Sequence, residues 1–82
     1  MFIGYGTQAM QALQALARID EGAHLIALLR IQAKLISLDG DGVVDTTVEF
    51  SLDDNKFVVS FIVAMTGVEA TIAELDWQVN GV

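Results

Sequence analysis

The spacing of hydrophobic residues changes at Ser37, and this change constrains the fold more than any other feature of the chain. Over 7–36 apolar residues recur every three or four positions, the period of an amphipathic helix. Over 43–80 apolar and polar residues alternate, the period of β-strands. We therefore expect an α+β fold, a long or broken N-terminal helix packed on a three-stranded antiparallel β-meander. A chain of 82 residues has room for one domain, 1–82.

The helical segment is too long to fit a small globule as one straight rod. Its thirty residues, 7–36, would extend ~45 Å, whereas a domain of this length is about 30 Å across. A break would fall at Asp20-Glu21-Gly22, because glycine destabilises a helix interior and acidic residues suit the start of a new helix. The sequence leaves one helix and two helices equally open. The hydroxyl of Thr7 is expected to cap the start of the segment.

Two strands are expected directly after the helical segment. The first alternates from Val44 to Phe50, and the second, Lys56 to Met65, is apolar on both faces, which indicates a central strand. A turn over Leu52 to Asn55 joins them, since Asp and Asn tolerate left-handed conformations. A two-residue loop there puts one set of side chains on a common face toward the helix. That set is Val48, Phe50, Phe57, Val59 and Phe61.

The last segment, 68–80, has two interpretations. Thr66-x-x-Glu69 is a capping-box pattern that could start a helix, but the alternation from Thr71 through Leu75 and Trp77 to Val79 favours a third antiparallel strand. A two-residue turn at Thr66-Gly67 would place Leu75 and Trp77 on the outer face. A three-residue loop that includes Met65 would place them in the core, and this second register is preferred.

Charge and composition exclude several classes of partner. Residues 1–38 carry a charge of +1 and residues 39–82 carry −8, and the net charge of −7 repels nucleic acid and anionic membrane surfaces. No cysteine is present, so neither a disulfide nor a thiolate zinc site compensates for the small core. The N-terminal stretch has no basic region of a signal peptide and too many glutamines for a transmembrane segment. A cytoplasmic location is the default expectation.

One short segment resembles a metal-binding loop. Residues 37–45 are similar to the calcium loop of EF-hands and dockerins from the third loop position to the ninth, and the resemblance implies Asp39, Asp41 and Asp45 as calcium ligands. Ser37 stands at the first ligand position and Val48 at the twelfth, where tight loops have carboxylates. The resemblance therefore implies weak calcium binding at most, and a plain helix-to-strand connection is favoured.

No constellation of residues points to catalysis or to a cofactor. His24 is the only histidine, so it has no second histidine for a metal and no Ser or Cys nucleophile as a partner. The acidic pairs Asp53 with Asp54 and Glu74 with Asp76 are better explained by solvation of a turn and a strand face. The chain is therefore not expected to be an enzyme.

The apolar surplus instead predicts self-association. Hydrophobic residues make up 54% of the chain, the helical stretch after Gly22 is apolar on more than one side, and the central strand is apolar on both. We expect a non-catalytic, acidic interaction or structural module, such as an accessory, adaptor, chaperone-like or virion component, whose partner is a second copy of itself, in a dimer or higher oligomer, or another protein. The alternatives are a module that binds a small apolar ligand on the sheet face or in an oligomer cleft, and the weak calcium module. The expected interface residues are Leu28, Ile31, Leu35, Val58, Ile62, Ala64 and Trp77.

Overall fold

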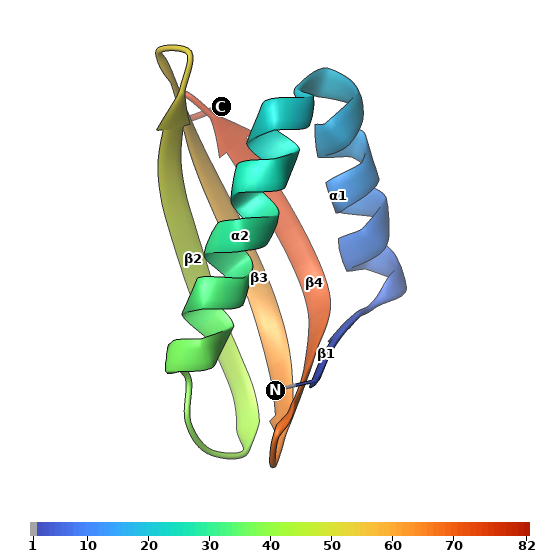
Figure 1. Cartoon of the computed structure of the whole chain (residues 1–82). Helices are drawn as coiled ribbons and strands as arrows, with labels where there is room; N and C mark the ends of the chain where they lie inside the picture. Colours follow the sequence, from blue (N-terminus) through green and yellow to red (C-terminus); the bar gives the residue numbers. More distant parts are fainter. Residues whose placement is uncertain (1) are drawn as a thin grey trace.

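The change of spacing at Ser37 coincides with the end of the second helix. The structure, a computed structural model, describes residues 2–82, and its two helices and four-stranded sheet agree with the expected α+β class (Figure 1). The elements follow the order β1 (Phe2–Tyr5), α1 (Thr7–Ile19), α2 (Glu21–Ser37), β2 (Gly42–Leu52), β3 (Asn55–Thr66) and β4 (Glu69–Val79).

The helical segment is broken at Asp20, so the alternative with two helices is the right one. The backbone of Asp20 is extended, and its N–H donates to the carbonyl of Leu16 at 2.8 Å, which closes α1. Its Oδ1 accepts a hydrogen bond from the N–H of Ala23 at 3.0 Å and so caps α2. Gly22 lies inside the first turn of α2. The two helices can therefore run in opposite directions within a molecule 37 Å long (Figure 1).

The start of α1 differs from the expectation. Thr7 is the first helical residue and Gly6 is the N-cap, which makes no side-chain hydrogen bond, so the prediction of a Thr7 cap is wrong. Gly6 lies directly against β4, where its N–H donates to the carbonyl of Ile72 at 2.7 Å. A Cβ at this position would come within 2.9 Å of the same oxygen. The chain needs glycine here because the backbones of two elements approach each other closely.

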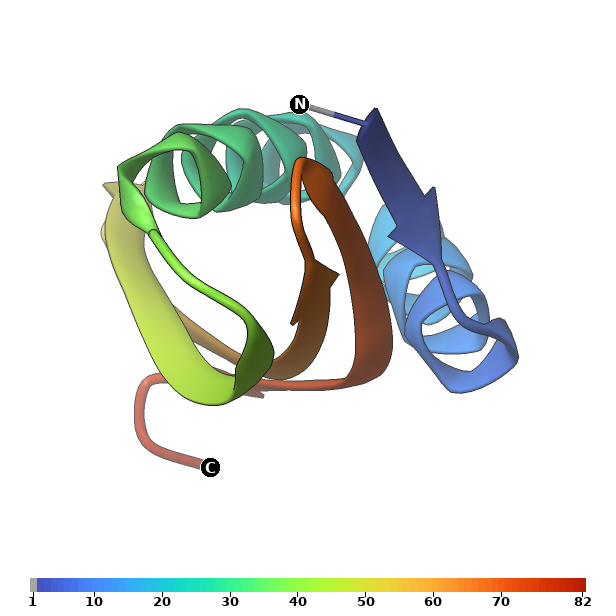
Figure 2. The ribbon, with the colours of Figure 1, turned by 90° about the horizontal axis from the view of Figure 1, so that it is seen from below.

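The sheet contains a strand that the sequence did not reveal. Its order is β1-β4-β3-β2, and β1 pairs in parallel with the first residues of β4, Glu69 to Ile72. The expected antiparallel meander is correct for β2, β3 and β4, but the sheet is four-stranded and mixed, so the expectation of a purely antiparallel three-stranded sheet is wrong. Seen along the strands, the sheet curls around α2, whereas α1 lies beside β4 and β1 (Figure 2).

The hairpin of β2 and β3 has the predicted register. Val48 is opposite Val59 and Phe50 is opposite Phe57, and the members of this face are buried. The turn consists of Asp53 and Asp54, both with positive φ (51° and 65°), which is the mirror-image type I turn that suits the twist of two-residue hairpins. The stacked rings of Phe50 and Phe57, with centroids 5.2 Å apart, fix β2 to the core.

The last segment is a strand, as favoured, but it reaches its register by an unexpected route. Thr66 is opposite Glu69, so the turn contains two residues and not the three that were preferred. Leu75 still points into the core, because a β-bulge at Ala73 shifts the pairing between Ile62 and Val63 of β3. As a consequence the buried positions change parity along β4: Ala70 and Ile72 are buried before the bulge, and Leu75 after it.

Candidate interaction surfaces

Two of the expected interface residues belong to the core of the single chain. Ile31 and Leu35 of α2 have no exposed surface, because this side of the helix faces the concave side of the sheet. Leu28 is half-buried and packs against the same core. The side chains of Ile31 and Leu35 are therefore not offered to a partner, which corrects their placement at an interface.

The expected strand residues divide between the two faces of the sheet. Trp77 is half-buried on the core side, opposite Val59, so its ring extends the core. Val58 and Ile62 are half-buried on the outer face, where Ala64 is exposed. The structure thus keeps three of the expected residues together on one outer surface, and separates them from Trp77.

Carboxylates surround this outer surface. Asp45 lies opposite Ile62 on β2, and Glu74 lies opposite it on β4. A hollow of about 380 Å³ opens there, lined by Gln8, Asp45, Ser60, Phe61, Ile62, Glu74, Leu75 and Asp76. With three carboxylates in its lining, the hollow does not favour an apolar ligand.

The exposed side of α2 carries a second apolar stripe. Leu25, Leu29 and Ile36 are 58%, 67% and 72% exposed, although all three belong to a helix whose opposite side fills the core. We call these three residues the α2 stripe. Their spread around the helix was visible in the sequence, but the sequence did not show which side of α2 the sheet would cover. A groove of about 370 Å³ continues from the α2 stripe to β2, lined by Ile26, Leu29, Arg30, Ala33, Phe50 and Ser51.

The groove ends at a free sheet edge. β2 is the last strand of the sheet on that side, and within residues 2–82 no strand pairs with its outer edge (Figure 1). This edge is eleven residues long, and the pairing of β2 with β3 runs over its whole length without a bulge. It also contains no proline. β2 therefore lacks several features by which proteins usually prevent a strand edge from pairing.

The segment that resembles a calcium loop is a connection between α2 and β2. The Oδ1 atom of Asp41 accepts a hydrogen bond of 2.6 Å from the N–H of Gly67 and so joins this connection to the β3–β4 turn. Asp39 lies in the connection, and Asp45 lies within β2. Among residues 2–82, no group of three or more His, Cys, Asp or Glu side chains is arranged to hold a metal ion.

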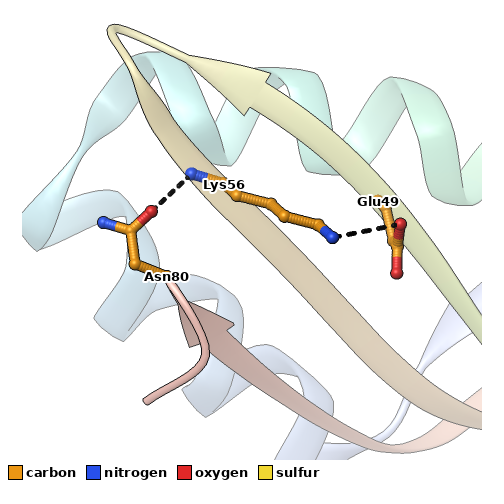
Figure 3. Close-up of polar contacts among 3 residues, drawn as sticks. All are labelled: Glu49, Lys56 and Asn80. Atoms are coloured by element: carbon orange, nitrogen blue, oxygen red, sulfur yellow. Dashed lines mark hydrogen bonds and ion pairs between the residues drawn. The ribbon is translucent and has the colours of Figure 1, made fainter.

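The polar contacts at the other end of the sheet are structural. Asn80, which follows β4, accepts a hydrogen bond from the N–H of Lys56 through its Oδ1 atom at 2.8 Å (Figure 3). The backbone N–H of Asn80 donates to the carbonyl of Lys56, also at 2.8 Å. The Nζ atom of Lys56 lies 3.8 Å from Glu49 on the exposed outer face. Such an exposed ion pair contributes little to stability. Asn80 closes the end of the sheet against the β2–β3 hairpin.

His24 lies half-buried in α2, in the turn after Asp20, and its backbone N–H donates to the carbonyl of that residue as part of the helix start.

Neither α1 nor α2 is both long and apolar enough to cross a membrane, and they are the helices of the described chain. Comparisons of the chain with known protein families, with curated proteins and with solved structures find no match.

Proposed function

We propose that this protein is a non-catalytic, self-associating interaction module of the cytoplasm, and that its association surface is the side formed by α2 and β2. The observation that carries the proposal is the α2 stripe beside the free edge of β2. Three large apolar side chains are each more than half exposed, and one of them, Leu29, lines a groove that reaches a strand with unpaired backbone groups. Contiguous apolar surface of this kind is typical of interaction sites.

A second copy of the chain fits this surface for a geometric reason. An antiparallel strand edge is complementary to itself under a two-fold axis, and two-fold dimers are the commonest closed assemblies. Leu29, which lines the groove beside that edge, would lie near its own copy across the same axis. The proposed interface thus replaces the expected one, which combined Val58, Ile62 and Ala64 with the buried helix residues.

The mass of the protein in solution tests the proposal. At ~50 μM, light scattering coupled to size exclusion should give about twice the 8.8 kDa of one chain, because specific dimers usually persist at that concentration. Each copy carries a charge of −7, so association should strengthen when salt is added, since salt screens the repulsion between copies.

Two matched variants locate the surface. Leu29→Asp should yield a folded monomer, because Leu29 is 67% exposed and its replacement costs little within one chain. Val68→Asp, at an apolar position in the β3–β4 turn that is 76% exposed, should remain a dimer. A wild-type mass of one chain would refute self-association. A Leu29→Asp variant that stays dimeric would place the interface elsewhere.

A further inference from the structure

The backbone of β2 alternates between groups that bond β3 and groups that face the free edge. Along two antiparallel strands, pairs of opposite residues that are joined by two backbone hydrogen bonds alternate with pairs that have none between them. Lys56 directs its N–H and its carbonyl to Asn80, on the β4 side, so the pair of Ser51 with Lys56 is one without hydrogen bonds. The even-numbered residues of β2 therefore bond β3, and the odd-numbered ones point outward. The outward residues are Val43, Asp45, Thr47, Glu49 and Ser51.

We propose that two copies of the chain join β2 to β2 in antiparallel orientation, so that the two four-stranded sheets become one sheet of eight strands. This inference rests on the proposed self-association and specifies its geometry. It also places both copies of α2 on the same side of the combined sheet, next to the two-fold axis. Leu29 of the α2 stripe, which lines the groove beside β2, then lies near the bare edge in the same interface.

Three registers place the two-fold axis near the middle of β2, at Thr46, Thr47 or Val48, and the charges on β2 favour one of them. A two-fold axis at Thr47 would put Asp45 directly opposite the partner's Glu49, and like charges in this position repel. An axis at Thr46 avoids that pair but brings no cation near either acid. An axis at Val48 puts Ser51 opposite the partner's Asp45, and the neighbour of Ser51 on β3 is Lys56.

Lys56 is the only cation after residue 38 of the sequence. In the register with the axis at Val48 it lies two strand spacings, ~10 Å, from the partner's Asp45 on the same sheet face. Its contact with Glu49 in the same chain shows that its side chain extends across this face (Figure 3). The structure therefore favours pairing from Val44 to Leu52 about an axis at Val48.

Amide hydrogen exchange tests the strand pairing, with a control within the same strand. At concentrations where the protein is a dimer, the N–H groups of Asp45, Thr47, Glu49 and Ser51 should exchange at least about tenfold more slowly than after dilution to monomer. The N–H groups of Thr46, Val48 and Phe50 bond β3 and should be protected in both states. A dimer whose outward amides exchange freely would overturn the strand pairing and leave self-association intact. A monomer at every concentration would overturn both.

Cysteine pairs test the register, because the chain has no cysteine of its own. The double variant Thr47→Cys/Glu49→Cys should form a covalent dimer on mild oxidation, since these positions are opposite each other about an axis at Val48. Asp45→Cys/Thr47→Cys reports an axis at Thr46, and Thr47→Cys alone reports one at Thr47, because Thr47 would then lie opposite its own copy while both carboxylates are kept. Fastest cross-linking in either of these two variants would overturn the proposed register.

Discussion

The two edges of the sheet differ in how the chain treats them. At one edge the four-residue strand β1 pairs with the first part of β4 and leads directly into α1, so this edge is partly closed by the chain itself. At the other edge β2 offers eleven residues in regular register, and no strand of the described chain pairs with them. We call them the closed edge and the open edge.

The contrast shows that the chain protects one edge and leaves the other available. An exposed strand edge is a template for pairing with another chain, and proteins usually block it with bulges, proline or a covering element. Here the bulge lies in β4, next to the closed edge. The charges of the open edge, Asp45 and Glu49, project from the outer face of the sheet.

The largest expected effect comes from the residue that holds the open edge to the core. Phe50→Ala should lower the free energy of unfolding by about 3–4 kcal/mol, because it removes a buried ring stacked on Phe57. Urea unfolding at a concentration where the protein is monomeric measures this without a contribution from association. At the closed edge, Ile3→Ala should cost only about 1 kcal/mol, since Ile3 is partly exposed. Equal costs at the two edges would contradict the comparison.

A glycine pair tests how tightly the closed edge is packed. Gly6→Ala should lower the free energy of unfolding by about 1–3 kcal/mol, because the new Cβ would lie 2.9 Å from the carbonyl oxygen of Ile72 and force β1 away from β4. Gly4→Ala is the control, since its nearest neighbour would be the hydroxyl of Thr71 at 3.8 Å. A stable Gly6→Ala variant, compared by thermal melting, would show that α1 does not start against β4.

The parts of the fold with a long, regular pattern could be predicted from the sequence. The helical segment and the three long strands each show their period over many residues, and the hairpin register follows because a one-residue slip would expose Phe50 and Phe57. β1 could not be predicted, since four residues are too few to show an alternation. The bulge at Ala73 could not be predicted either. The residues of β4 before and after the bulge each alternate, and only the pairing with β3 shows where the buried positions change from even to odd numbers.

The sequence predicted an exposed apolar surface but not its position. An apolar excess on α2 is visible in the sequence, yet Ile31 and Leu29 are equally hydrophobic, and only packing decides which of them is buried. The open edge depends on strand order, which alternation within a strand does not contain. The sequence therefore indicated an apolar surplus, and the fold shows which apolar side chains stay exposed and which strand edge stays unpaired.

A smaller effect is expected at the turn that ends the open edge. Asp54→Gly should raise the free energy of unfolding by about 0.5–1 kcal/mol, because Asp54 has a φ of 65° and glycine adopts this conformation without strain. Urea midpoints of the two proteins measure the gain. Gly67→Ala in the other hairpin turn is the reverse control and should destabilise, since Gly67 has a φ of 58°. If Asp54→Gly were destabilising, the turn would not have this geometry in solution.

The smallest effect concerns the closed edge and depends on pH. Burial raises the pKa of Tyr5 above its usual value of about 10, so the unfolded chain loses the phenolic proton at a lower pH than the folded protein does. The folded state then binds more protons above pH ~10, and its stability must fall as the pH rises through that range. Tyr5→Phe should lose less stability between pH 9 and pH 11 than the wild type, as measured by urea unfolding at each pH. All other titratable residues are the same in both proteins, so the difference isolates Tyr5. Identical pH profiles would mean that the phenol of Tyr5 is in water and is not buried where β1 meets the rest of the fold.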